Sequence, residues 1–243
     1  MGNIGLIAGR ELKAYFRSPL GYVAAAGALL IDGILFMAMA MGGPGSRQLS
    51  AKVLSDFFYY TSGVTMILAV ALSMRVIAQE HERGTLVLLK TSPISDTQLV
   101  LGKYFATLAV LTLITLLTGY MPALVYSYGR VSVGHIAVGY TGLLLLAAVA
   151  SSVGVFSSAL AKSQVIAAIL GAVIMGALVL MWLLARVTEA PVDDFIEGLA
   201  VHHLRFRDFM TGVLRLENVV YYLALSFFFL LASIKTLEAR RWR

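Results

Sequence analysis

Residues 138–185 read VGYTGLLLLAAVASSVGVFSSALAKSQVIAAILGAVIMGALVLMWLLA, and this stretch decides the fold. It contains two apolar runs, 138–160 and 164–185, separated by a short turn that holds its one charged residue, Lys162. Each run is long enough for a helix to cross a bilayer, which takes about 20 residues. Neither run shows the alternation of apolar and polar residues that a membrane-barrel strand requires. The stretch therefore predicts two transmembrane helices.

Small residues recur at every fourth position in both runs. The first run carries Ala150, Gly154 and Ser158, and the second carries Ala168, Ala172 and Gly176. Because this spacing lets two helices approach closely, we expect the pair to pack as a hairpin around the turn at Lys162.

Four further apolar runs lie outside this pair, near 20–42, 61–79, 104–128 and 218–235. The composition agrees, because 59% of the 243 residues are apolar and 13% are charged, with a mean hydropathy of +0.85. A soluble domain has about 25% charged residues. An ordinary soluble enzyme is excluded, since so much apolar surface could not stay in water. We expect one all-α integral membrane domain over residues 1–243, with six transmembrane helices.

The distribution of Lys and Arg predicts the orientation. Twelve of the nineteen lie at the termini or in the loops on the same side as the termini, and seven lie on the other side. The positive-inside rule then places both termini in the cytoplasm. The net charge of +6 fits contact with anionic lipid and does not indicate nucleic acid.

A cleavable signal peptide is the competing interpretation of the first run, since Ala38-Met39-Ala40 resembles a cleavage site. However, both the apolar run and the segment before it are too long for a signal peptide.

No catalytic or metal-binding arrangement is evident in the sequence. The chain has no cysteine, its four histidines are scattered, and Gly102-Lys103 does not belong to a Walker A motif. The adjacent pair His202-His203 would point apart on a helix, and no third ligand is near. We therefore expect no metal and no cofactor bound by this chain, and any energy source must be a partner protein or an ion gradient.

Asp32 is the one acid deep inside an apolar run, and no basic residue is expected to be buried in another run. Ala24, Ala25 and Ala28 lie on the same helical side, so the carboxyl should face the bundle or a wet cavity. Two roles stay open: contact with substrate or a coupling ion, or a packing residue held by hydroxyl groups.

Residues 3–18 form an amphipathic pattern. Ile4, Ala8, Leu12, Tyr15 and Phe16 fall on one side of a helix, and Arg10, Lys13 and Arg17 on the other. We expect this helix to lie flat in the inner headgroup layer, with its cations toward anionic lipid.

The loop 79–103 predicts a second helix outside the bilayer. Glu80 and Glu82 follow the second run, Gly84 ends a helix, and Thr85 can cap the next one. The short helix that follows is apolar through Leu88 and Leu89, is stopped by Pro93, and suits docking into a groove on a partner. An ordinary interfacial loop is the alternative. Ser95 or Asp96 can cap the helix leading into the third run.

The outer loop 186–217 is long and contains two amphipathic stretches. One begins at Pro191 and the other extends from Leu204 to Leu216. Two short helices there could cap a pore.

The order of these parts resembles an ABC-2-type transporter permease. The loop from Glu82-Arg83-Gly84-Thr85 through Ser92-Pro93-Ile94-Ser95 to Gly102-Lys103 is similar to the family pattern Glu-Arg-x-Gly-Thr-x-Glu-x-Leu…Ser-Pro-x-Ser…Gly-Lys. It departs from the pattern in a shorter spacer before Gly84 and in Val87, where an acid is frequent. Within the family, the chain most resembles the gliding-motility-associated permeases and the nitrous-oxide-reductase maturation permease. That resemblance lies in three motifs: Arg10-Glu11-Leu12-Lys13-Ala14-Tyr15-Phe16-Arg17-Ser18-Pro19 near the start, Phe209-Met210-Thr211-Gly212-Val213, and Leu237-Glu238-Ala239-Arg240-Arg241-Trp242 near the end.

The resemblance implies the non-catalytic membrane subunit of an ABC exporter in a bacterial inner membrane, which works as two permease copies or two related permeases. Two cytoplasmic ATPase subunits would bind the ATP and magnesium. It implies a coupling helix at 84–92, with an ATPase-coupling set of Glu80, Glu82, Arg83, Gly84, Thr85, Leu88, Leu89, Thr91 and Pro93. The interfacial helix, with Arg10, Lys13, Tyr15, Phe16 and Arg17, would brace the membrane surface beside it. An ion-gradient-driven transporter and a structural scaffold of a motility-type complex remain as alternatives, and the substrate is open.

Overall fold

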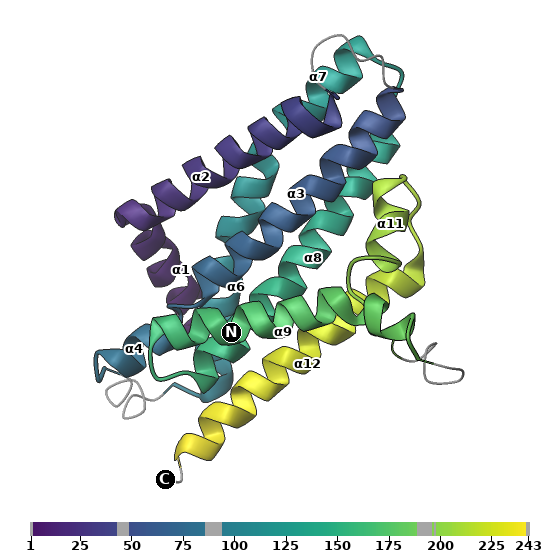
Figure 1. Cartoon of the computed structure of the whole chain (residues 1–243). Coiled ribbons are helices and arrows are strands. Elements are labelled where there is room, and N and C mark those ends of the chain that lie inside the picture. The colour runs from purple at the N-terminus through teal and green to yellow at the C-terminus, as the bar shows by residue number, and fades with distance from the viewer. Residues whose placement is uncertain (1, 43–48, 86–93, 189–195, 197, 242–243) are drawn as a thin grey trace.

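The computed structural model describes residues 2–42, 49–85, 94–188, 196 and 198–241 (Figure 1). In this part of the chain all regular elements are helices, and six helical segments are long and apolar enough to cross a membrane. The predicted all-α fold with six transmembrane helices is confirmed. In chain order the elements are α1 (Gly2–Arg17), α2 (Pro19–Leu35), the π-helix η1 (Phe36–Ala40), α3 (Ser50–Ser73), α4 (Ala78–Glu82), α6 (Asp96–Leu117), α7 (Tyr120–Tyr128), α8 (Val133–Leu160), α9 (Gln164–Ala185), α11 (Arg205–Met210) and α12 (Leu216–Arg241).

Helix α8 is the centre of the bundle. It packs against α3, α6, α9, α11 and α12, and most of its side chains are buried. A Cβ added at Gly154 would lie 2.4 Å from the Cβ of Ser73, so α3 and α8 touch almost backbone to backbone. The predicted hairpin of α8 and α9 forms, but the small residues of α8 face α3 instead. On α9, Ala172 is exposed and nothing lies within 4 Å of a Cβ added at Gly176, because the buried face there is offset to Gly171 and Met175.

Two of the spans contain a break. The second span leaves the α-helical path over residues 74–77, between α3 and α4. Ser158 of α8 repairs this break: its hydroxyl oxygen accepts from the backbone N–H groups of Ile77 and Ala78, both at 2.9 Å, and its proton goes to the Met74 carbonyl at 3.0 Å. In the third span, Pro122 lacks an N–H, and the helix breaks between α6 and α7 just before it.

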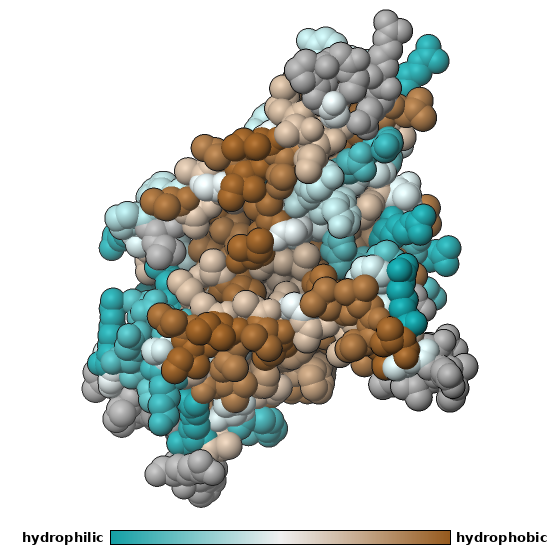
Figure 2. Space-filling view, in the orientation of Figure 1, coloured by the Kyte–Doolittle hydropathy of each residue, from teal (hydrophilic) through white to brown (hydrophobic). Residues whose placement is uncertain are grey.

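The surface carries an apolar band, which Figure 2 shows as brown residues across the face that contains α9. In the most apolar 18-residue stretch of α9 only 17% of the residues are buried, compared with 72% in the corresponding stretch of α8. The exposed side chains on α9 include Val165, Ile169 and Val173. This surface must be covered by lipid or by another membrane subunit, because water cannot stably cover so much apolar area.

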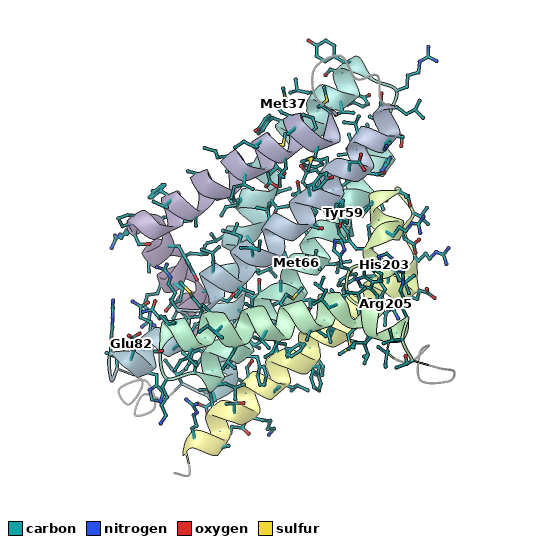
Figure 3. The ribbon with its side chains drawn as sticks, in the orientation of Figure 1. Met37, Tyr59, Met66, Glu82, His203 and Arg205 are labelled. Atoms are coloured by element: carbon teal, nitrogen blue, oxygen red, sulfur yellow. The ribbon has the colours of Figure 1, made fainter. Side chains whose placement is uncertain are left out.

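The chain before the last span folds back onto the bundle through α11. Phe206 and Phe209 are fully buried, and a Cβ added at Gly142 of α8 would lie 2.5 Å from the Cβ of Phe209. Helix α11 ends at Met210, before Gly212 with its φ of +80°, so the second predicted helix is shorter than 204–216. The other stretch begins at Pro191, which lies outside the described residues. In Figure 3, His203 and Arg205 near α11 lie far from Glu82 at the opposite end of the molecule.

Candidate functional site

Helix α1 is packed against the beginning of α6. A Cβ added at Gly102 would lie 2.7 Å from the Cγ2 atom of Ile7, so the glycine is what lets the two helices meet. Ile7 and Tyr15 are buried, and Glu11 lies between them at the same four-residue spacing. Phe16, expected on the apolar side, is instead 46% exposed. The buried face of α1 is set by contact with α6 and is rotated away from Phe16.

Tyr15 fixes α1 to the bundle by hydrogen bonds. Its hydroxyl donates to the Leu72 carbonyl at 2.8 Å and lies 3.3 Å from the Thr107 hydroxyl. Burial raises the pKa of Tyr15 above its usual value, so the phenol stays neutral and keeps its proton for this bond. The guanidinium of Arg75 lies over the Tyr15 ring, 4.3 Å from the centroid.

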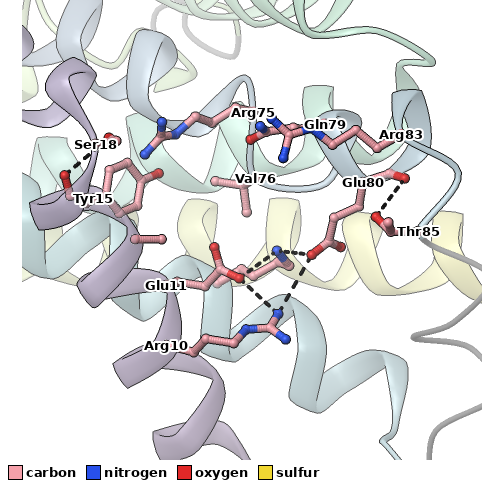
Figure 4. Close-up of a pocket in the computed structure, with 12 residues that line it drawn as sticks. Arg10, Glu11, Tyr15, Ser18, Arg75, Val76, Gln79, Glu80, Arg83 and Thr85 are labelled. Carbon is pink, nitrogen blue, oxygen red and sulfur yellow. Dashed lines mark hydrogen bonds and ion pairs between the residues drawn. The ribbon is translucent and has the colours of Figure 1, made fainter.

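A four-residue ion network, which we call the Lys103 network, joins α1, α4 and α6 (Figure 4). Its members are Arg10, Glu11, Glu80 and Lys103. The Lys103 ammonium lies 3.1 Å from Glu11 Oε1 and 2.8 Å from Glu80 Oε1. The Arg10 guanidinium lies 3.1 Å from Glu11 Oε1 and 3.8 Å from Glu80 Oε1. The two cations and two carboxylates neutralise one another.

Lys103 is the buried centre of this network, because only 2% of its side chain is exposed. A buried ammonium is tolerated only when it is paired, and here two other helices supply the carboxylates. Sequence reasoning missed Lys103 and Glu11 and expected no buried basic residue in the third span. The expected cap at Ser95 is confirmed, but Lys103 was assigned to the loop before the apolar run that begins at 104. Ser95 and Gln98 form a capping box that begins α6 at Asp96, so Lys103 falls on the second turn of a packed helix.

Glu80 and its neighbours end the second span. Gly84, with a φ of +69°, closes α4 as expected, and the Thr85 N–H donates to the Glu80 carbonyl at 3.0 Å. Thr85 therefore terminates α4. The Glu80 carboxylate points inward to Lys103, whereas Glu82 accepts a hydrogen bond from Gln164 at 3.2 Å. Leu88, Leu89, Thr91 and Pro93, on which the coupling-helix hypothesis depends, lie outside the described residues.

Three motifs of the sequence thus meet in space. Arg10-Glu11, Glu80 and Gly102-Lys103 come from separate segments, and each contributes to one contact between α1, α4 and α6. A family model described as ABC-2 family transporter protein matches residues 14–233. The chain belongs to this family. A comparison with curated proteins gives no match. Membership makes the chain a multi-pass membrane component of a transporter.

Asp32 is the second polar feature of this ABC-2 permease. It lies on α2 with 4% of its surface exposed, and its Oδ1 atom has no hydrogen-bond partner among the described residues. The side chain of Thr61, on α3, lies beside the carboxyl. An orphaned carboxyl oxygen inside a bundle is uncommon, because burial without a partner is unfavourable.

The two adjacent histidines of the permease point in different directions. His202 Nε2 lies 2.7 Å from the Ser62 hydroxyl, and the His203 ring stacks on Trp182 with centroids 4.2 Å apart. They therefore cannot ligate one ion together. In the described part of the chain no group of three or more His, Asp or Glu side chains has a geometry suited to a metal. Burial lowers the pKa of His202 to about 4, and the charge of His203 adds a smaller contribution in the same direction.

Proposed function

We propose that the chain is the membrane subunit of an ATP-driven exporter in a bacterial inner membrane, with both termini in the cytoplasm. Two permease subunits, identical or related, would surround the pathway, and two cytoplasmic ATPase subunits would supply the energy from ATP and magnesium. Family membership supports the permease role. The specific likeness to gliding-motility and nitrous-oxide-reductase maturation permeases rests on short sequence motifs alone and is part of the proposal.

The observation that carries the proposal is the Lys103 network. Glu80 belongs to α4, and Gly84 at the end of α4 begins the proposed coupling helix at 84–92. Glu80 is paired with Lys103 on α6, and Lys103 is also paired with Glu11 on α1. A displacement of α4 would therefore be transmitted to α6 and α1 through these ion pairs. In this scheme Leu88 and Leu89 contact the ATPase, Glu82 and Arg83 flank that contact, and Glu80 transmits the movement inward. ATP binding would shift the populations of the inward-open and outward-open forms.

Docking and transmission are tested by two different variants. The double change Leu88→Asp with Leu89→Asp should weaken co-purification of the ATPase, because an interface accepts unpaired charge poorly. Glu80→Gln should leave co-purification intact and reduce the ATP hydrolysis rate of the assembled complex, since it weakens the contact with Lys103. The matched control is Glu238→Gln, which removes a carboxylate from the exposed pair with Lys235. Normal co-purification and transport by the double variant would show that residues 84–92 are not the coupling helix.

Asp32 favours a second candidate, a transporter driven by an ion gradient, because one oxygen of its buried carboxyl has no hydrogen-bond partner in the described part of the chain. Under this alternative, Asp32→Asn should assemble normally but lose transport or its pH dependence. Under a packing role the amide replaces the carboxyl, and transport and stability stay close to wild type. Collapse of the gradient with a protonophore, at constant ATP, separates the two energy sources. A structural scaffold without transport would be insensitive to all of these changes.

A further inference from the structure

A cavity of about 650 Å³ lies beside the Lys103 network, between α1, the α3–α4 break and the beginning of α6 (Figure 4). Its charged lining consists of Arg10, Glu11, Arg75, Glu80, Arg83 and Lys103. The charges do not balance across the cavity. Both carboxylates pair with Lys103 and Arg10 through their Oε1 atoms, while Glu80 Oε2 has no hydrogen-bond partner among the described residues. In the same part of the chain neither Arg75 nor Arg83 has a carboxylate within ion-pair distance. The cavity therefore has two uncompensated guanidinium groups.

These two guanidinium groups occupy one side of the cavity. Arg75, Gln79 and Arg83 follow one another at four-residue spacing, which places their side chains along one edge, as Figure 4 shows. Arg75 is held in position by the ring of Tyr15, which is itself buried and hydrogen-bonded. The aromatic ring orients the cation but supplies no counter-charge. Two arginines and an amide thus line one side of a cavity in which both carboxylates are already paired with Lys103 and Arg10.

Guanidinium donors in this arrangement match the oxygens of a phosphate group, which they bind by paired, charge-assisted hydrogen bonds. The cavity lies at the end of the transmembrane helix α3 and against the amphipathic helix α1. Both features place it at the depth of lipid headgroups. We propose that the cavity binds a phosphate-bearing anion through Arg75, Gln79 and Arg83, and that in the membrane this anion is the headgroup of an anionic phospholipid. Such a headgroup would link α1 to the α3–α4 break that leads toward residues 84–92.

The inference goes beyond the proposed exporter, because any membrane protein with this cavity would present it to lipid whatever its energy source. The test uses the purified full-length chain in phosphatidylcholine bilayers doped with phosphatidylglycerol. Native mass spectrometry then measures how much phosphatidylglycerol stays bound after extraction. Wild type should retain it in preference to phosphatidylcholine. Arg75→Gln and Arg83→Gln should each lower its affinity about tenfold, the loss expected for one charge-assisted contact.

The matched control is Arg17→Gln, which removes an exposed α1 cation that does not line the cavity. It should retain phosphatidylglycerol like wild type, and an equal loss would overturn the site in favour of general surface attraction. Arg75 also packs on Tyr15, so its variant loses that contact as well. Arg83 is exposed, and its variant therefore tests binding alone. Unchanged retention in the Arg83 variant overturns the proposal.

Two further arms identify the source of the anion. Inorganic phosphate is added to the lipid-free protein, and its binding is measured by calorimetry. If phosphate binds through Arg75 and Arg83 and displaces phosphatidylglycerol, the site accepts the shared phosphate group, whereas binding of lipid alone shows that the headgroup is held together with its chains. If Arg75→Gln and Arg83→Gln both keep phosphatidylglycerol but no longer co-purify with the ATPase, the two arginines contact the ATPase. That result would overturn the lipid assignment.

Discussion

Lys103 carries a full positive charge although only 2% of its side chain is exposed. The carboxylates of Glu11 and Glu80 stabilise this buried charge. Removing one partner of a buried ion pair leaves an uncompensated charge and costs about 3–5 kcal/mol. Lys103→Met should therefore lower the free energy of unfolding by about 3 kcal/mol, because two carboxylates are left close together. Thermal unfolding in detergent measures the change.

The triple variant Glu11→Gln, Glu80→Gln and Lys103→Met separates pairing from packing. It removes all three charges while keeping similar side-chain volumes, and neutral replacements of whole ion pairs are often harmless. Its melting temperature should return toward that of wild type. A triple variant as unstable as Lys103→Met would mean that the lysine contributes through its methylene packing and not through its charge.

His202 provides a pH dependence with a definite sign. Burial lowers its pKa to about 4 in the folded protein, while the unfolded chain has the ordinary value of about 6.5. Between these values the unfolded state binds the proton, so stability is fully present above about pH 6.5 and falls as the pH decreases toward 4. The slope is up to about 1.4 kcal/mol per pH unit. In the His202→Gln variant the unfolding midpoint should no longer change with pH over this window. The control is His203→Gln, at a ring that stacks on Trp182, and this variant should keep the pH dependence of the wild type.

At the scale of elements, the helices followed from the sequence better than their contacts did. The six apolar runs predicted six spans because crossing a bilayer requires length and hydrophobicity, and both are local properties. The cap at Ser95 was predicted for the helix that leads into the third span and is confirmed, but nothing in that pattern indicated that Lys103, on the second turn of α6, is buried. Which face of a helix is buried depends on its neighbour. For α1 the neighbour is Gly102 on α6, and no periodicity within residues 3–18 could reveal it.

At the break between α3 and α4, a side chain of α8 supplies the hydrogen bonds that the helical backbone lacks. Two backbone N–H groups that lose their helical partners there are satisfied by the Ser158 hydroxyl of α8. Ser158→Ala should leave both donors unpaired, and each unpaired buried group costs about 1–3 kcal/mol. We expect a lower melting temperature and faster hydrogen exchange at Ile77 and Ala78.

Ser157 is the matched control for this experiment, because its hydroxyl donates to the Val153 carbonyl of its own helix at 2.8 Å. Ser157→Ala should have little effect on stability, since the Val153 carbonyl keeps its helical hydrogen bond. Equal losses in the two variants would show that the break between α3 and α4 does not depend on α8.

For the whole molecule, the question left to experiment is which end faces the cytoplasm. The turn between α8 and α9, with Lys162, lies at the same end as α4, and α11 lies at the other. Lys162 and Arg207 are both exposed. Arg205 is a poorer probe position, because its guanidinium donates to the Gly198 carbonyl at 3.1 and 3.2 Å.

The chain has no cysteine, so a single introduced thiol is the one site that a maleimide can label. The excess of Lys and Arg on the side of the termini predicts that Lys162 faces the cytoplasm. In spheroplasts, the Arg207→Cys variant should react with a membrane-impermeant maleimide, and the Lys162→Cys variant should react only after the membrane is opened. The reverse pattern would place α4, the Lys103 network and its cavity on the outer side. No cytoplasmic ATPase could then reach residues 84–92, and the proposed coupling would be wrong together with the orientation.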